Sequence, residues 1–520
     1  MLAGRAAKSA AAIMIISALS KFLGLFRESV IAAFFGAGSE TDAYRVAFEV
    51  PSVLTGVIYA AIATTFIPVY SDFKNETRER RLYFVNNLFN IVTLITALIA
   101  VFGMAAAPLL VKFIAPGFEG GTHELAVKFT VLLCPSVVFL ALAYLANGYL
   151  QSNRRFAITA FMGIPLNLTV IFSVILFGSA GIEALAVGSL LAMASQFLIQ
   201  APTLFKEGYR FFPVFDFKEP GFRKVLILSV PVFISTAFNE ASILIDKMLA
   251  SGFDAGSISV LDYASKVNGI AGGIFFSSLA IVLFPELAAA SEDAGKFAKA
   301  VTAGLKTVIL ISFPIMAVIF VQRVPIIRLL FERGAFDPVN TKTTSALLGF
   351  YSIGIMGSGV TALLNRTFYS LKDTKTPMVN GILSICVNIV LSFIFARIWG
   401  IFGLASASAF ASLFCGLSLF IRIGKRISLR FGDMGKLLIK CGAAAAAAGS
   451  LMYFLSSRGV WPLHEGAASV TVFLKLAVIS SAGFIAYICM LFILKTSELT
   501  HIVKPVLKKF GWPESFLKIF

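Results

Sequence analysis

Apolar runs long enough to cross a lipid bilayer recur along the whole of this chain. A helix needs roughly 20 residues to span the hydrocarbon core, and hydrophobic residues make up 58% of the 520 positions while charged residues make up 14%. This composition excludes a set of soluble domains and indicates an all-α polytopic membrane protein. We predict about fourteen transmembrane helices, at residues 9–35, 46–70, 84–111, 126–150, 157–178, 182–205, 225–250, 258–285, 303–322, 345–370, 377–396, 401–421, 437–456 and 468–494.

Lysine and arginine are distributed unevenly between these spans. If the N-terminus lies in the cytoplasm, the cytoplasmic segments hold 27 of these residues and the external segments hold eight. This asymmetry predicts that both termini are cytoplasmic, because positively charged loops stay on that face. The net charge of +17 is then explained by topology and by contact with anionic membrane lipids. We therefore expect no nucleic acid partner.

A sequence pattern repeats with an offset of about 219 residues. The pattern Gly-Ile-x-x-Leu-Ala-x-x-Ser-x-x-Ala at 181–192 recurs at 400–411, and Asn153-x-Arg155 is echoed by Asp373-x-Lys375. Six spans fit in each period, which predicts two parallel six-helix repeats related by an axis along the membrane normal. Chance recurrence of small-residue motifs in helical membrane proteins is the alternative. We assign the N-lobe to 1–220, the C-lobe to 221–430, and two further helices with a cytoplasmic tail to 431–520.

Charged side chains interrupt the first two predicted spans of each repeat, where a charge near the bilayer centre costs roughly 2.5–3.5 kcal/mol. They are Lys21, Arg27, Glu28, Arg45, Glu49, Glu240, Asp246, Lys247, Asp262 and Lys266. Because equivalent helices of both repeats carry them, they favour a hydrated cavity between the lobes, where transporter sites lie. The alternative is that they form buried ion pairs which hold the helices together.

The deeper of these charges indicate the chemistry of the substrate. Lys21, Arg27 and Lys266 lie further inside their spans than most of the acids do, and arginine and lysine are the side chains that bind phosphate. We therefore expect an anionic, phosphate-bearing substrate. The chain has no P-loop, no GxSxG and no HExxH motif, so we predict a transporter and not an enzyme.

Several motifs resemble those of a known membrane protein family. They occur in order over roughly residues 5–425, and they read Ser20-Lys21-x-Leu23-Gly24-x-x-Arg27-Glu28, Phe35-Gly36-Ala37-Gly38, Thr41-Asp42-Ala43, Ala115-Pro116-Gly117-Phe118, Asn153-Arg154-Arg155-Phe156 with Asn167, Leu330-Phe331-Glu332-Arg333-Gly334-x-Phe336-Asp337 and Phe368-Tyr369-x-x-x-Asp373-x-Lys375-Thr376-Pro377. Together they resemble the signature of the MurJ (MviN) family of lipid II flippases, within the multidrug/oligosaccharidyl-lipid/polysaccharide exporter superfamily. The fold that this implies, two six-helix lobes plus two helices, agrees with the repeats.

The resemblance implies that the protein moves lipid II, an undecaprenyl-pyrophosphate-linked peptidoglycan precursor, across the bacterial inner membrane. The family does so through a cationic cavity that alternates in access. The family's essential arginine in the first span falls on Arg27, which Glu28 follows, and the preceding cation falls on Lys21. The acidic residue after the first external turn falls on Asp42, and the arginine of the eighth span falls on Lys266.

Two further residues are candidates for a cation site. Asp246 in the seventh span and Asn388 in the eleventh offer oxygen ligands, although asparagine in such helices often bonds to a neighbouring helix. The resemblance adds that some members carry a sodium-coordinating carboxylate whose nearest match is Asp246. We expect no organic cofactor, and sodium or the membrane potential is the candidate driving force.

The second span departs from the family pattern. The family commonly has an arginine a few residues after the proline of this span, but the run 52–56 that follows Pro51 contains no cation. We predict that Arg45 on the same helix replaces it, closer to the external mouth. The alternative is an ion pair between Arg45 and either Asp42 or Glu49, which the i−3 and i+4 spacings allow.

The sequence therefore predicts a lipid II flippase that works by alternating access. A flippase for another polyprenyl-linked glycan and a cation-coupled drug exporter of the same superfamily are alternatives. A scaffold that recruits cell-wall synthesis proteins is an alternative from a different class, and such proteins are candidate partners in either case.

Overall fold

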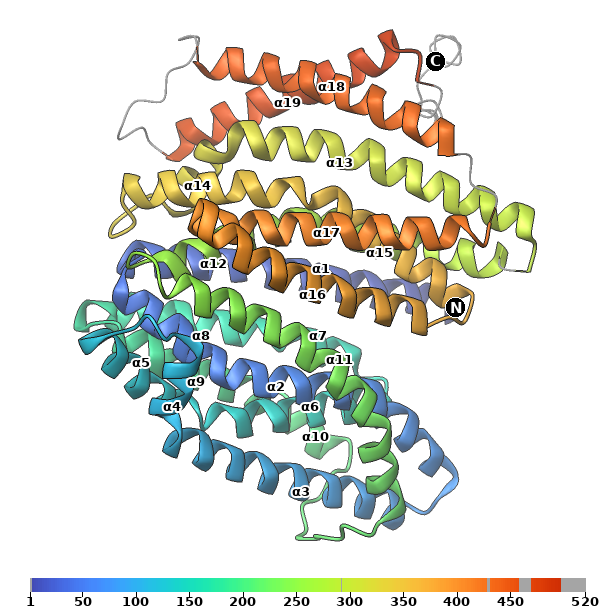
Figure 1. Cartoon of the computed structure of the whole chain (residues 1–520). Coiled ribbons are helices and arrows are strands. Elements are labelled where there is room, and N and C mark those ends of the chain that lie inside the picture. The colour runs from blue at the N-terminus through green and yellow to red at the C-terminus, as the bar shows by residue number, and fades with distance from the viewer. Residues whose placement is uncertain (1, 291, 428–430, 458–468, 497–520) are drawn as a thin grey trace. The chain divides into compact units, whose positions relative to one another are not determined.

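The computed structural model of the protein describes residues 2–290, 292–427, 431–457 and 469–496. In these residues the regular structure is helical throughout (Figure 1), as the sequence predicts. The chain divides into two compact units, of which the first comprises residues 1–262 and 331–340 and the second comprises 263–330 and 341–520. The predicted lobes at 1–220 and 221–430 are defined by repeats and not by contacts, so they stay predictions.

The first unit contains most of the N-terminal helices. Its helices are α1 Leu2–Phe35, α2 Ser39–Asp72, α3 Arg78–Ala105, α4 Ala107–Ile114, α5 Gly120–Leu133, α6 Ser136–Ser152, α7 Phe156–Phe161, α8 Gly163–Phe177, α9 Glu183–Leu198, α10 Ala201–Lys206, α11 Pro220–Ala250 and the start of α12 Ser257–Ala290. The helix α11, which opens the predicted second repeat, packs along α2 in this unit. The contacts between α2 and α11 therefore lie within this unit.

The second unit contains the rest of α12 and the C-terminal helices. They are α13 Ala294–Phe331, α14 Pro338–Ile353, α15 Ile355–Ser370, α16 Lys375–Trp399, α17 Ile401–Gly424, α18 Phe431–Ser457 and α19 Ser469–Ile493. The last two helices pack together and against α13, where Leu437, Cys441 and Tyr487 surround Ile309. The Tyr487 hydroxyl donates to the Leu310 carbonyl at 3.1 Å. The two appended helices are thus part of this unit's core.

Ten helices in the described residues are long and apolar enough to cross a membrane, or up to twelve if each bent pair is one span. The helices α1 and α12, which correspond to the predicted first and eighth spans, have 34 residues each. That length exceeds the roughly 20 residues that a membrane requires. The all-α multi-span architecture is confirmed, and the count of fourteen stays a prediction.

Two predicted spans are broken in the middle, at corresponding places in the two repeats. The axes of α5 and α6 differ by 40°, and those of α14 and α15 differ by 43°. Backbone conformations recur in the same way: Arg154 and Lys372 have φ of 62° and 59°, and Gly181 and Gly400 have φ of 119° and 58°. Each pair is separated by nearly the predicted offset. Local geometry therefore repeats along with the sequence.

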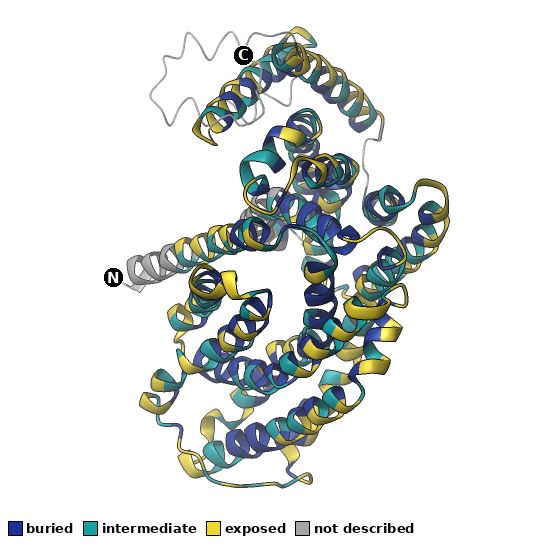
Figure 2. Ribbon diagram, turned by 90° about the vertical axis from the view of Figure 1, so that its left-hand side faces the viewer, coloured by how far each residue is buried: buried dark blue, intermediate teal, exposed yellow. Residues whose placement is uncertain are grey.

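Burial alternates around the helices, as expected for a protein that contacts lipid. Figure 2 shows buried and exposed residues on the same helices. Large apolar side chains such as Phe102, Leu109 and Ile227 are at least 70% exposed, which in water would be unfavourable. Inside the first unit, Phe66 and Phe84 are fully buried and their rings stack 6.2 Å apart. The first unit therefore has a packed aromatic interior and exposes apolar side chains on its outer surface.

Candidate functional site

Glu28 forms ion pairs with two arginines in the first unit. This carboxylate is buried on α1, and the Nη2 atoms of Arg27 and Arg45 lie 2.7 Å and 2.6 Å from its two oxygens. Arg27 comes from the same helix and Arg45 from α2, so the carboxylate joins the two helices. Buried charges are tolerated when they are paired in this way. Arg27 and Glu28, which follow Leu23-Gly24 after two apolar residues, are thus an adjacent base and acid joined by an ion pair.

Arg45 also binds an acid on a third helix. Its Nη1 lies 2.7 Å from Asp262 Oδ2 on α12, and its side chain is only 6% exposed. The pairing with Asp42 or Glu49 that the spacing allowed is not what the structure contains. The reason is tertiary, because α1 and α12 each bring a carboxylate to the guanidinium and so displace partners on the same helix.

A second ion pair joins α2 to α11. The Lys247 ammonium contacts the Glu49 carboxylate and donates to the Arg45 carbonyl at 3.3 Å. About two turns after Glu49 on α2, a Cβ on Gly56 would lie 2.9 Å from Glu240 Oε1. The missing side chain at this glycine therefore lets a carboxylate of α11 approach the α2 backbone.

The described pairs balance in charge. Arg27, Arg45 and Lys247 pair with Glu28, Glu49 and Asp262. Six of the ten charges that the sequence assigns to a cavity therefore form ion pairs within this unit. Arg27 is the most open of the three cations with 22% of its side chain exposed. Its buried Nε has no hydrogen-bond partner in the described structure. Of these three paired cations, Arg27 is therefore the best placed to bind a ligand.

Asp42 caps the first turn of α12. Its Oδ2 accepts from the backbone N–H of Gly256 at 2.7 Å, and its Oδ1 accepts from the backbone N–H and the hydroxyl of Ser259 at 2.8 Å and 2.6 Å. A carboxylate at a helix N-terminus satisfies free N–H groups and complements the helix dipole. The structure thus gives Asp42, predicted to bind substrate, a helix-capping contact.

Glycine motifs bring distant loops into contact beside this cap. The N–H of Ala335 donates to the carbonyl of Ala33 at 2.8 Å. Gly36 and Gly334 have φ of 63° and 58°, and a Cβ on Gly334 would lie 2.1 Å from the Ala33 oxygen. Only glycine fits both the backbone conformation and the space. Two of the family-like motifs are therefore contact points between the end of α1 and the loop after α13.

A third family-like motif makes the same kind of contact. The Gly117 N–H donates to Ser251 Oγ at 3.1 Å, at the end of α11. A Cβ on Gly117 would lie 2.2 Å from the Ser251 carbonyl oxygen. The loop after α4 thus packs tightly on the α11 to α12 connection.

The remaining predicted site residues lie on α1, α11, α12 and α16. Lys21 is exposed on α1, while Lys266 on α12 is half-buried and belongs to the second unit. Asp246 is half-buried on α11 and Asn388 is buried on α16, where its Nδ2 lies 3.4 Å from Ser408 Oγ. The described residues contain no group of three or more His, Cys, Asp or Glu side chains that could hold a metal.

The turn between α15 and α16 holds a separate ionic contact. Asp373 accepts from the Thr376 backbone N–H at 2.9 Å and from its hydroxyl at 2.7 Å. Arg426 Nη2 lies 2.6 Å from the same carboxylate. These hydrogen bonds, the backbone one foremost, lower the pKa of Asp373 to about 2. The motif that contains Asp373 therefore stabilises a turn outside the apolar spans.

Sequence reasoning missed three polar residues that share a cavity in the second unit. Arg366 lies inside the predicted span 345–370 and was detectable as a charge in an apolar run. Asn268 and Asn365 line the same cavity. Asparagine is common in membrane helices, so no sequence signal distinguished these two.

Most of the chain is similar to proteins described as lipid II flippases. A family model described as "Lipid II flippase MurJ" matches residues 31–470. A "Probable lipid II flippase MurJ" of Vibrio cholerae is 30% identical over 436 residues, which cover 80% of this chain and 82% of the relative. The similarity therefore spans both compact units.

Solved structures show the same fold. A structure titled "Lipid II flippase MurJ, inward closed conformation" has a TM-score of 0.79 at 25% identity, covering 93% of this chain and 98% of that one. An inward-facing multidrug resistance MATE family transporter has a TM-score of 0.67 at 14% identity, covering 81% of this chain and 98% of the other. The second likeness extends to the fold alone.

Proposed function

The chain belongs to the MurJ family of lipid II flippases, and on this basis we propose that it carries lipid II across the bacterial cytoplasmic membrane by alternating access. The match of the family over residues 31–470 is the observation that carries the proposal. The many apolar helices support a multi-pass membrane protein. The substrate is a polyprenyl pyrophosphate that bears a glycan, so the protein must bind phosphate as well as sugar.

Arg27 and Lys266 are the residues we propose for the pyrophosphate. Arg27 keeps an Nε without a partner in the described structure and is partly exposed, and a guanidinium binds phosphate oxygens in a bidentate way. Glu28 pairs with Nη2 of the same guanidinium at 2.7 Å and so fixes its orientation. Lys266 would act as a point charge. Arg45, which is held between Glu28 and Asp262, is proposed to orient Glu28.

Transport of lipid II by reconstituted variants tests this proposal. Each charge-assisted contact contributes roughly 1.5–3 kcal/mol, so Arg27→Ala and Lys266→Ala should weaken lipid II binding by roughly tenfold to a hundredfold. Both should fail to complement depletion of a flippase while they insert normally. Lys128→Ala is the matched control, because Lys128 is 62% exposed in a surface pair with Glu183. Full transport by both variants would contradict the assignment of Arg27 and Lys266 to the pyrophosphate.

The membrane orientation follows from the distribution of charge. We propose that both termini are cytoplasmic, because the segments that would then lie inside carry most of the lysine and arginine. Reporters fused after Arg155, Lys224 and Lys436 should read cytoplasmic, and reporters after Gly120 and Gly256 should read external. One reversed reporter would change the number of spans.

The driving force is proposed to be a sodium gradient or the membrane potential. Asp246 on α11 and Asn388 on α16 are the residues that we propose as oxygen ligands for sodium. Replacing sodium by choline outside or inside the proteoliposomes tests the ion, and clamping the potential with valinomycin tests the field. Transport that ignores both changes would leave the substrate gradient as the source of energy.

A further inference from the structure

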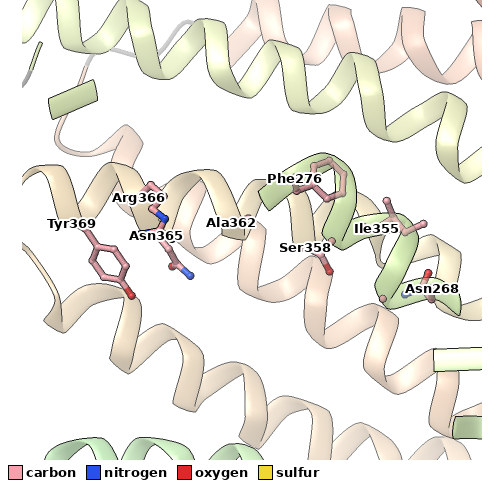
Figure 3. A pocket seen from close by; sticks show the side chains of 11 residues that line it. Asn268, Phe276, Ile355, Ser358, Ala362, Asn365, Arg366 and Tyr369 are labelled. Carbon is pink, nitrogen blue, oxygen red and sulfur yellow. The ribbon is translucent and has the colours of Figure 1, made fainter. Parts of the chain in front are cut away.

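The second compact unit contains a cavity of about 550 Å³ between α12 and α15 (Figure 3). Three glycines of α12, at 269, 272 and 273, form part of its wall, and α15 contributes Ser358, Asn365, Arg366 and Tyr369. A Cβ on Gly269 or Gly273 would meet nothing within 4 Å. The glycines thus leave space open that side chains would otherwise fill.

Two buried carbonyl oxygens of this cavity have no partner. The Oδ1 atoms of Asn268 and Asn365 are inaccessible to solvent, and neither accepts a hydrogen bond within the described part of the chain. A buried acceptor that stays unpaired costs about 1–3 kcal/mol, and such groups are rare in native proteins. Both residues line the cavity, so a turn of either amide about its Cβ–Cγ bond would bring its oxygen to a ligand there that supplies the missing donor.

The two amides lie at opposite ends of the cavity. Figure 3 shows Asn268 beside Ile355, while Asn365 lies with Arg366 and Tyr369 toward the other end of α15. Ten residues of helix separate Ile355 from Asn365, which corresponds to roughly 15 Å. One small cation cannot bind both oxygens. The arrangement suits an elongated molecule with hydrogen-bond donors along its length.

We propose that this cavity binds the glycan part of lipid II through hydroxyl and amide N–H groups that donate to Asn268 and Asn365. The inference rests on the proposed function. A pyrophosphate at neutral pH has only acceptors, so it does not satisfy two carbonyl oxygens, whereas a sugar with hydroxyl and acetamido groups does. The rings of Phe276 and Tyr369, which also line the cavity, offer apolar surface to the sugar faces.

The test separates the glycan from the pyrophosphate. The full-length protein in detergent is titrated with lipid II and, in parallel, with the same polyprenyl pyrophosphate without its glycan, and both affinities are read by native mass spectrometry. Asn268→Leu and Asn365→Leu should each weaken lipid II binding about threefold to tenfold, and together tenfold or more. Binding of the glycan-free lipid should not change. Asn75→Leu, an exposed amide outside the cavity, is the control.

A second variant covers the case in which the leucine substitutions disturb folding. Gly269→Leu fits sterically at its Cβ and blocks the cavity, so it should reproduce the selective loss. Unchanged lipid II affinity in Gly269→Leu and in the double variant overturns the glycan site, and so does an equal loss for both ligands. Failure of the unmodified protein to bind either lipid would instead contradict the proposed function, on which the glycan site depends.

Discussion

Arg45 on α2 donates to Glu28 on α1 at 2.6 Å, and the two side chains are only 6% and 3% exposed. A buried pair of this kind adds little net stability compared with two apolar residues, but removal of one partner leaves a buried charge. Glu28 also pairs with Arg27, and Arg45 also pairs with Asp262. The pair is therefore the centre of a network that joins α1, α2 and α12.

Glu28→Gln should destabilise the protein more than the loss of an exposed acid does. Removal of one member of a buried ion pair costs about 3–5 kcal/mol, and here two arginines lose a partner. The measurement is equilibrium unfolding in detergent. Glu183→Gln is the control, because its pair with Lys128 is exposed and contributes at most about 1 kcal/mol. Equal effects of the two variants would show that Glu28 is solvated in the membrane.

Combining Glu28→Gln with Arg45→Met should recover part of the stability that Glu28→Gln alone removes. The double variant lacks both charges of the pair, so it should be more stable than the sum of the single changes predicts, by about 0.5–3 kcal/mol. The remaining loss reflects the contacts of Arg27 and Asp262. Strict additivity would mean that the two side chains do not interact in the folded protein.

Asp42→Ala should impair folding before it impairs substrate binding. The change removes acceptors for the N–H groups of Gly256 and Ser259, and loss of a helix cap costs about 0.5–2 kcal/mol. Asp42→Asn keeps one carbonyl oxygen, so its stability should lie between those of the unmodified protein and Asp42→Ala. The measurements are thermal unfolding and lipid II affinity, side by side. A variant with normal stability and no lipid II binding would return Asp42 to the predicted substrate site.

Three alanine substitutions separate backbone strain from steric contact. Gly121→Ala should be nearly neutral, since Gly121 is not among the positive-φ glycines and its Cβ would meet nothing within 4 Å. Gly120 has φ of 52° and open space, so Gly120→Ala should cost about 1 kcal/mol from the left-handed backbone alone. Gly334→Ala adds a contact of 2.1 Å with the Ala33 oxygen and should cost clearly more. Unfolding free energies in the reverse order would contradict the glycine argument.

The helices were predictable because membrane spans carry a strong signal. Predicted spans such as 377–396 and 401–421 fall inside α16 and α17. The break in 126–150 was missed because hydropathy reads this segment as one apolar run. The axes of α5 and α6 differ by 40° at Pro135, and a proline inside a helix is a known cause of a kink. Hydropathy reports how apolar a segment is, and both halves of a bent span are equally apolar, so it does not reveal the bend.

The site was predictable in its residues but not in its pairing. Charges in apolar runs identified Arg27, Glu28, Arg45 and Asp262, yet their partners depend on which helices pack together. Neutral amides such as Asn365 left no signal, because asparagine is tolerated in membrane helices for structural reasons. Tertiary contacts decide these roles, and a single sequence does not contain them.

The stabilising effect of Asp373 should depend on pH. Hydrogen bonds from Thr376 and the contact with Arg426 lower the pKa of this carboxyl from 3.8 to about 2. A carboxyl whose pKa is lower in the folded state stabilises the protein above its unfolded pKa, and the effect is lost as the pH falls through the folded value. The difference in melting temperature between the unmodified protein and Asp373→Asn should therefore be constant above about pH 5 and should shrink between about pH 4 and pH 2. Because Arg426 is 46% exposed, Arg426→Ala should remove only a small part of that difference. A difference that grows on acidification would show that the carboxylate is not the stabilising form.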